Sequence, residues 1–504
     1  MGKDRQFYPF HGGLELKNFK QLSNNQQSFI TPLPERMILP MQQNIGVPAV
    51  PFVKQGDRVL KGQKIATANG HVSVPVHAST SGKVIEISEH ITPLNHSPQL
   101  CIIIEPDGED HWFDVEAVDD YMSIEPKKLQ HLIREAGIVG MGGAGFPACV
   151  KLEEGTVSTV DTLIINGVEC EPYISCDDRI IREKAHYIVA GTRMLRHAVQ
   201  AKYCVIAVED DMPEAFDALH KLVDDDIDLV KIPTHYPAGG EKQLVKVLTG
   251  KEIPSGSLPI DIGMIIHNVG TAAAAYRAVT RGEPLISRYV TVSGNVQKPR
   301  NLQVLLGTPV EHCLQQVDYH PSTDDLIVMG GPMMGKKLQN ISMPIIKTTN
   351  SILVTSQAAQ MHDELPCIKC GKCVDVCPAQ LLPQELFKYS RAEDWEKTRE
   401  FHLFDCIECG CCAYVCPSHI PLVQYYREAK HGIAQHEKQS KQYKHTNVRF
   451  EARKQRLTQL DKSVNKNINT ENIQDIAPDT SADKQQYIKK ATQRTQAKKT
   501  KLRE

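Results

Sequence analysis

Two short cysteine runs constrain the fold of this 504-residue sequence more than any other feature. The first run occupies positions 367–378 and the second, 39 positions later, occupies 406–417, and both follow the spacing C-x2-C-x2-C-x3-C-P. Thiolates at this spacing ligate iron–sulfur clusters, and the fourth cysteine of each run binds the cluster of the other run. The two runs are therefore expected to lie side by side.

The spacing predicts two [4Fe–4S] clusters with crossed ligands. The first predicted ligand set consists of Cys367, Cys370, Cys373 and Cys416. The second predicted set consists of Cys406, Cys409, Cys412 and Cys377. Cys411 lies within the second run but off the spacing, and we interpret it as a packing residue.

Zinc is the main alternative ligand of such cysteines. It also takes four thiolates, but usually from two C-x2-C pairs separated by a longer loop, so two triplets closed by x3-C-P do not suit it. Disulfides fit poorly because closely packed cysteines of this kind are typical of cytosolic metal sites. The runs therefore indicate an electron carrier.

The composition is that of a soluble chain with about three or four domains. Hydrophobic residues make up 41% and charged residues 23%, which is ordinary for globular proteins. The first residues lack the apolar stretch of a secretory signal. No segment reaches the ~18–20 uninterrupted apolar residues of a membrane span. These features predict a cytoplasmic or peripheral protein.

The charge is unevenly distributed along the chain. Residues 431–504 carry 17 Lys/Arg against 8 Asp/Glu, a net charge of +9, whereas the remainder carries −11. This basic tail has few large apolar residues and cannot bury a core, so it is expected to be disordered or loosely helical. A basic tail can contact anionic lipid or nucleic acid, but its sparse charges favour a solvated extension without a dedicated ligand.

Residues 30–105 read as a small β unit made of two matching halves. This unit resembles the barrel-sandwich fold of biotinyl and lipoyl carriers. The hairpin tip at residues 67–71 has no lysine to accept a swinging arm. We therefore interpret the unit as a structural module.

Residues 126–280 alternate helical and strand patterns, which is typical of an α/β domain. Residues 137–151 contain a glycine-rich loop that ends in Lys151. Glycines allow backbone N–H groups to approach an anion, and the lysine adds a charge for a phosphate. No Gly-Lys-Ser/Thr closes the loop, so it is not a Walker A motif.

The glycine-rich loop resembles the flavin-binding loop of the NADH-oxidising subunit of respiratory complex I, G-L-R-G-R-G-G-A-G-F-P-T-G-x-K. Residues 165–172 resemble that family's N-A-D-E-x-E-P, residues 236–241 its Y-x-x-G-E-E, and residues 267–271 its N-N-V-E-T. Four motifs in the same order argue against coincidence.

The whole of residues 10–430 is similar to the RnfC (RsxC) family, which belongs to the Rnf (Rsx) ion-translocating electron-transport complexes. The resemblance implies a multidomain fold of α/β and α+β classes. Its parts are an N-terminal segment with a barrel-sandwich module (1–125), a Rossmann-like FMN/NADH domain (126–284), a β-grasp SLBB module (285–355), a twin-cluster ferredoxin-like helical domain (356–430) and the basic tail (431–504).

The same resemblance implies site residues. The FMN site would comprise Gly140, Gly142, Gly143, Gly145, Lys151, Asn166, Asn268 and Thr271. The nicotinamide site would comprise Phe146, Glu169, Glu171, Tyr236 and Glu241. The chain departs from the family pattern at Met141, Val168 and Gly240, which replace an Arg, an Asp and a Glu.

The function implied is electron transfer from NADH through FMN and the two clusters, or in reverse from ferredoxin to NAD. The partners would be integral membrane subunits and other redox subunits, with soluble ferredoxin a further candidate, at the cytoplasmic face of the bacterial inner membrane. No nucleic acid and no catalytic acid, base or nucleophile is expected. The alternative is a ferredoxin-like relay adaptor without nucleotide chemistry.

Overall fold

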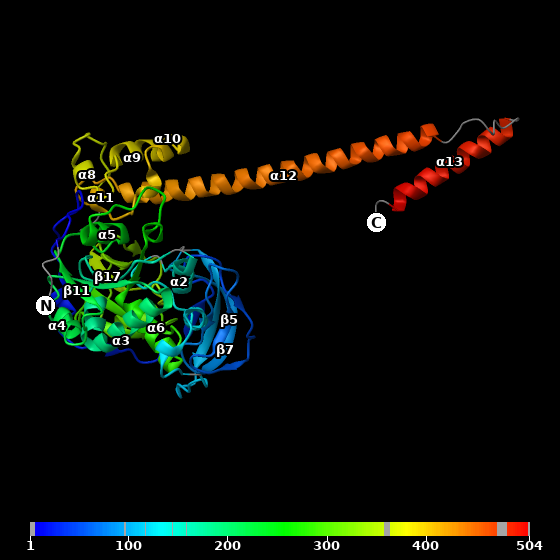
Figure 1. The fold of residues 1–504 in the computed structure, drawn as a ribbon. Coiled ribbons are helices and arrows are strands. Elements are labelled where there is room, and N and C mark those ends of the chain that lie inside the picture. The colour runs from blue at the N-terminus through cyan, green and yellow to red at the C-terminus, as the bar shows by residue number, and fades with distance from the viewer. Residues whose placement is uncertain are drawn as a thin grey trace. The chain divides into compact units, whose positions relative to one another are not determined.

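The computed structural model describes residues 6–94, 97–115, 117–143, 145–157, 159–356, 363–470 and 481–501. The chain divides into two units, Met1–Lys430 and His431–Glu504. The first unit contains every predicted site residue. Figure 1 shows its elements in chain order.

Residues 37–106 form the barrel sandwich. One sheet has the order β2 (Met37–Pro40), β8 (Pro98–Pro106), β7 (Gly82–Ile91) and β4 (Arg58–Val59). The other has the order β3 (Val50–Pro51), β5 (Lys64–Thr67) and β6 (Val76–His77). Val59, Ile65 and Ile102 are fully buried in the shared core. The apolar face of each sheet is thereby removed from water.

The α/β domain is built on a four-stranded parallel sheet. Its order is β11 (Asp228–Ile232), β10 (Tyr203–Glu209), β9 (Thr162–Gly167) and β12 (Met264–Asn268). Successive residues of β9 enter different cores: Leu163 and Ile165 belong to one and Ile164 to the other. A sheet buried on both faces explains why its strands are almost continuously apolar.

Helices cover both faces of this sheet. One side carries α3 (Cys176–Val199), which packs on α6 (Val269–Arg281), α4 (Pro213–His220), and α1 (Pro126–Glu135) with α2 (Ala148–Val157). The other core contains α5 (Glu241–Thr249). The chain runs outward from β9 to β11 and then returns to add β12 on the opposite edge of β9. Ligands of open α/β sheets bind beyond the carboxyl ends of the strands at such a switch point.

A six-stranded mixed sheet follows. Its order is β1 (Phe29–Ile30), β14 (Arg300–Leu305), β13 (Ser287–Gly294), β17 (Ser351–Ser356), β15 (Asp325–Met329) and β16 (Lys336–Lys337), with α7 (Val310–Gln315) beside it. The edge strand β1 comes from the N-terminal segment and pairs in parallel with β14. This long-range pairing was not predicted, because a two-residue strand has no pattern of its own.

The cysteine runs lie in a small helical region. It contains α8 (Lys372–Asp375), α9 (Pro383–Arg391), α10 (Trp395–Glu400), α11 (Cys411–Tyr414) and the start of α12 (Leu422–Thr470). The helical spacer expected between the runs is present as α9 and α10. Single 3-10 turns complete the described elements: η1 (Lys20–Leu22), η2 (Tyr121–Ser123), η3 (Pro259–Ile262) and η5 (Leu403–Asp405).

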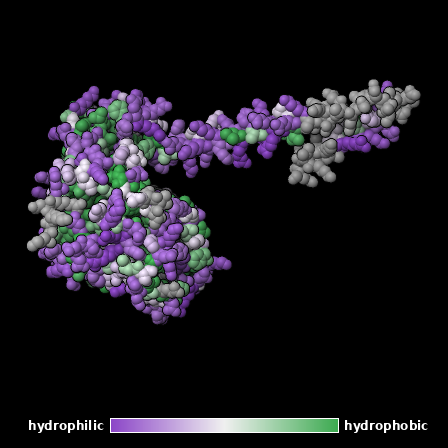
Figure 2. All heavy atoms as spheres, in the orientation of Figure 1, coloured by the Kyte–Doolittle hydropathy of each residue, from purple (hydrophilic) through white to green (hydrophobic). Residues whose placement is uncertain are grey.

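The second unit is helical where it is described. The helix α12 continues to Thr470, and α13 spans Ser481–Lys501. Past residue 440, all the described side chains are exposed, and most of them are hydrophilic in Figure 2. The described residues of the tail have the helical form, one of the two that the composition allowed. Within the described residues, no helix is long and apolar enough to cross a membrane.

Candidate functional site

The structure gathers the eight cysteines of the predicted ligand sets around two cavities. One cavity is lined by Cys367, Cys370, Cys373 and Cys416. The other is lined by Cys377, Cys406, Cys409 and Cys412, and also by Cys411, which lies off the ligand spacing. Each cavity takes three predicted ligands from one run and one from the other. Four thiols around one small cavity fit a cubane held by four thiolates.

Each run begins its short helix with a glycine in the left-handed region. Gly371 has φ +81° and caps α8, and Gly410 has φ +83° and caps α11. A Cβ on Gly410 would lie 2.7 Å from the carbonyl oxygen of Met333, whereas nothing lies within 4 Å at Gly371. Glycine is therefore favoured at both turns by conformation, and at Gly410 also by the lack of space.

The two cysteine sets differ in exposure. Cys367 and Cys370 of the first set are exposed, whereas Cys377, Cys409 and Cys412 of the second are buried. Burial raises the pKa of the Cys406 thiol to about 11. The thiolate form of Cys406, which binds metal, therefore needs compensating positive charge.

The second set lies against the α/β domain. The Tyr236 hydroxyl donates to the carbonyl oxygen of Cys409 at 2.6 Å. Tyr236, Cys409 and Cys411 are buried in one cluster, with Met333 packed against it. Tyr236 was predicted to line a nicotinamide site, and the structure places it beside the second cysteine set.

Glu171 supports the same contact. Its carboxylate accepts hydrogen bonds from the backbone N–H groups of Met333 and Met334, both at 2.8 Å. A Cβ on Gly331 would lie 2.3 Å from the Glu171 side chain. Burial raises the pKa of Glu171. Glu171 thus anchors the turn whose Met333 carbonyl faces Gly410.

The glycine-rich loop lies at the switch point of the sheet. A Cβ on Gly142 would lie 3.1 Å from the side chain of Asn268, the last residue of β12. The Met141 N–H donates to Thr271 Oγ1 at 3.0 Å. Asn268 caps α6 by accepting from Gly270 N–H and donates to Asp177 at 2.6 Å. The loop is therefore held at the start of α6.

The loop leaves its centre open. The Gly140 N–H donates to the Phe146 carbonyl at 2.8 Å and closes the turn. Gly142 and Gly143 are exposed, and a Cβ on Gly143 would meet nothing within 4 Å. Gly145 has φ +70°, and its Cβ would lie 2.3 Å from Thr348 Cγ2. Exposed backbone beside a helix N-terminus fits the phosphate of a flavin nucleotide.

Lys151 lies on the other side of this edge. Its ammonium is 2.6 Å from Glu241 at the start of α5 and donates to the Ile266 carbonyl at 3.3 Å. Both side chains are partly exposed, so this ion pair contributes little to stability and leaves the lysine available to a phosphate. Asn166 bonds to the Gly239 carbonyl and to the Val168 N–H.

The three residues that depart from the family pattern are packed against neighbouring residues. Met141 and Val168 are buried, and the Met141 side chain lies against Gly270. Gly240 directly precedes α5, and a Cβ there would come within 2.6 Å of Gln243 Oε1. None of the three positions offers a charged group to a ligand.

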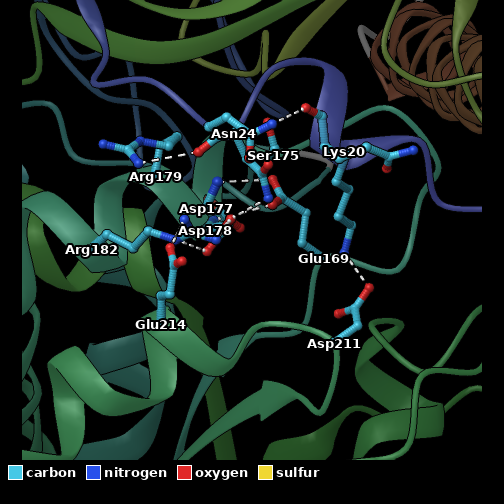
Figure 3. A network of polar contacts seen from close by, with 12 residues as sticks. Lys20, Asn24, Glu169, Ser175, Asp177, Asp178, Arg179, Arg182, Asp211 and Glu214 are labelled. Carbon is cyan, nitrogen blue, oxygen red and sulfur yellow. Dashed lines mark hydrogen bonds and ion pairs between the residues drawn. The ribbon is translucent and has the colours of Figure 1, made fainter.

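Glu169 belongs to a buried charge network (Figure 3). Its carboxylate accepts from the N–H groups of Asp177 and Asp178 at the start of α3. Lys20 contacts Glu209 at 2.9 Å and Asp211 at 3.6 Å. Burial, together with the charge of Asp177, raises the pKa of Glu169 to about 8. Glu169 is thus enclosed by the protein rather than open to a ligand.

Several residues beside the sites were not predicted from the sequence. Tyr426 lines the second cavity, and its hydroxyl donates to the Pro383 carbonyl at 2.6 Å. Lys430, one turn further along α12, donates to the Cys406 carbonyl at 2.7 Å. Tyr426 and Lys430 are four residues apart shortly after the second cysteine run, and this helical spacing could have identified them from the sequence. No local sequence pattern pointed to Lys20, because its acidic partners are distant in sequence.

Comparison with protein families assigns four regions of the chain. Residues 8–109 match the RnfC barrel sandwich hybrid domain, residues 133–277 the Nuo51 FMN-binding domain, residues 289–337 the SLBB domain and residues 366–420 the 4Fe-4S dicluster domain. These matches confirm the predicted fold class. These matches define a class of proteins in which an FMN-binding α/β domain is joined to a 4Fe-4S dicluster domain.

Curated relatives are similar along most of the chain. The RnfC-type protein of the ion-translocating oxidoreductase complex from Serratia proteamaculans is 46% identical over 90% of the chain, and that from Erwinia tasmaniensis is 45% identical. The Yersinia pestis bv. Antiqua (strain Antiqua) protein is 44% identical, and the match covers 74% of its length. The chain belongs to the RnfC family of ion-translocating oxidoreductase complexes.

The chain is shorter than these relatives. The matches cover 65% of the Serratia protein and 57% of the Erwinia protein. Among solved structures, an NAD+-reducing [NiFe]-hydrogenase in the H2-reduced state matches 64% of this chain and 62% of its own, at 16% identity and a TM-score of 0.44. That value is too low to define a common fold.

Proposed function

We propose that this chain is the peripheral electron-input subunit of a membrane-bound ion-translocating oxidoreductase complex. It passes electrons between NAD(H), FMN and two [4Fe–4S] clusters to membrane partners. The observation that carries the proposal is the contact between the two redox domains, in which the Tyr236 hydroxyl meets the Cys409 carbonyl. Membership of the RnfC family supports it.

The residues of the chain have separate tasks in this proposal. The open backbone at Gly142 and Gly143, with Lys151 nearby, would hold the FMN phosphate, and the two crossed cysteine sets would hold the clusters. FMN supplies the exchange between two-electron hydride chemistry and one-electron transfer when bound. The protein positions these groups and excludes water from the second set.

The placement of the cysteine sets suits a directional role. The second set is buried beside the α/β domain, whereas the first set presents Cys367 and Cys370 at the surface. A partner can therefore approach the first set directly. We expect that partner to be an integral membrane or redox protein of the same complex, on the cytoplasmic side of the membrane.

The proposal is tested by anaerobic reconstitution with iron, sulfide and FMN, followed by an NADH titration under electron paramagnetic resonance. We expect about eight irons per chain, since each cubane holds four, flavin absorbance, and two interacting cluster signals on NADH addition. Cys377→Ser should lose one signal, whereas Cys411→Ser should retain both. Zinc in place of iron, or fewer than four irons, would overturn the proposal.

A second candidate function is a ferredoxin-like relay without nucleotide chemistry. It is favoured by the burial of Glu169 and Tyr236 and by the internal hydrogen bonds of Glu171. In that case the reconstituted chain would contain both clusters but show neither flavin absorbance nor NADH-dependent bleaching. Dithionite would then reduce the clusters where NADH does not.

A further inference from the structure

A basic cavity lies outside the sites described above, between α3, α6 and the first residues of β13. Its volume is about 180 Å³. Its polar lining includes Lys184 from α3, Arg277 and Arg281 from α6, and Arg288 from β13. This is below the ~300–1,000 Å³ of pockets for drug-sized ligands and leaves room for a group of a few heavy atoms.

The lining carries excess positive charge. Four cations face one carboxylate, Glu283. Glu283 pairs with Arg277 at 2.5 Å and lies 3.9 Å from Arg281. Among the described residues, Lys184 has no ion pair with a carboxylate; it lies over the ring of Tyr187 at 5.9 Å. Asp177, outside the lining, partly offsets the charge of Arg288. The lining itself keeps an excess of positive charge, which attracts anions into a partly desolvated space.

Arg288 is the most enclosed of these cations, with 3% of its surface exposed. Its Nη1 donates to the Lys347 carbonyl and its Nη2 to the Met141 carbonyl at 3.0 Å. Its Nε is buried and has no hydrogen-bond partner among the described residues. A buried guanidinium with an unused donor is costly unless an anion or acceptor compensates it.

We propose that this cavity binds a small phosphate-bearing anion. Guanidinium groups recognise phosphate through their N–H donors. Arg281 contributes its guanidinium from α6, and Arg288 contributes its unpartnered Nε from β13. Ser287 and Gln303 add neutral polar groups to the lining. Tyr187 lies 4.9 Å from the Arg281 guanidinium and offers a ring face next to the charge.

The cavity is also connected to the flavin loop. Met141 and Gly270 are part of its lining, and Arg288 holds the carbonyl of Met141. Met141 N–H in turn bonds to Thr271. An anion bound to Arg288 therefore acts on the residue that fixes the glycine-rich loop at the start of α6.

The test is isothermal titration of the reconstituted full chain with inorganic pyrophosphate and, separately, with ADP. Lys184→Gln and Arg281→Gln each remove one cation of the cavity. Lys127→Gln, at an exposed position of α1, makes the same charge change elsewhere and is the matched control. Circular dichroism establishes that each variant is folded.

We expect pyrophosphate to bind at one site per chain, with an affinity that falls as the salt concentration rises. Lys184→Gln and Arg281→Gln should each weaken the affinity for pyrophosphate about tenfold. Lys127→Gln should change this affinity less than about twofold. Tighter binding of ADP, again lost in both cavity variants, identifies a nucleotide rather than a free phosphate. Absence of pyrophosphate and ADP binding, or equal losses in all three variants, overturns the proposal.

Discussion

Buried carboxylates and hydroxyls show how the surroundings of a residue change its role. Glu169 was expected to face a nicotinamide, yet it receives two backbone N–H groups at the start of α3. Tyr236 was expected there as well, and its hydroxyl meets the Cys409 carbonyl. Glu169 and Tyr236 both belong to motifs recognised in the sequence, but the groups to which they hydrogen-bond come from other parts of the chain.

The raised pKa of Glu169 has a consequence for stability. The folded protein holds a proton on this carboxyl up to about pH 8, whereas the unfolded chain releases it near pH 4.5. The folded state therefore binds more protons in this window, and stability falls as pH rises through it. We expect a thermal midpoint several degrees lower at pH 8 than at pH 5.5.

Glu169→Gln should remove most of this dependence, because a neutral amide does not titrate. Glu15→Gln, on an exposed position, should leave the slope of midpoint against pH unchanged. Differential scanning calorimetry at four pH values measures both. A Glu169→Gln slope equal to that of the wild type would refute the assignment.

Tyr236→Phe tests the link between the domains. It removes the hydroxyl donor to Cys409 and keeps the ring in its buried position. A hydrogen bond of about 1 kcal/mol corresponds to roughly 40 mV for one electron. We expect the potential of one cluster to fall by about that amount in a redox titration followed by electron paramagnetic resonance. Tyr203→Phe, on an exposed residue, should leave both potentials unchanged.

At the scale of elements, the two cysteine runs adopt the same turn but have different neighbours. Each run enters a short helix through a glycine at positive φ. Only α11 packs against the turn that follows β15, where Glu171 holds Met333. The repeat in sequence therefore becomes one enclosed set and one exposed set.

Gly371→Ala and Gly410→Ala form a matched pair. Both place a Cβ at positive φ, which costs about 1 kcal/mol. Only Gly410→Ala also brings that Cβ within 2.7 Å of the Met333 carbonyl. We expect Gly410→Ala to halve the iron content and Gly371→Ala to retain most of it, as measured by metal analysis after reconstitution. Equal losses would mean that the close approach has no effect.

At the scale of the whole molecule, the N-terminal segment joins parts that are distant in sequence. Leu14 forms a bridge with Tyr236, and β1 extends the sheet of β14. Lys20 inserts between Glu209 and Asp211. Residues 6–30 are thus structural components of the α/β domain and the six-stranded sheet, which no local pattern in them indicated.

The basic tail is expected to contribute little to the stability of the rest of the chain. Beyond residue 440 the described side chains are exposed, so they contribute no buried apolar area to a core. Truncation after residue 440 should leave the iron content unchanged and alter the thermal midpoint by less than about 2 °C. Scanning calorimetry and metal analysis of the truncated and full chains check this. A large loss of iron would show that the tail supports the cluster region.

Local sequence determined the order and type of the domains, because cysteine spacing, glycine-rich loops and strand periodicity are short-range properties. It also indicated which residues could carry charge or bind metal. Only the tertiary structure decided the partners of Glu169, Tyr236, Lys20 and Arg288, since each is determined by burial among segments that the fold brings together. Desolvation makes those pairings obligatory in the fold, and it leaves no trace in the local pattern.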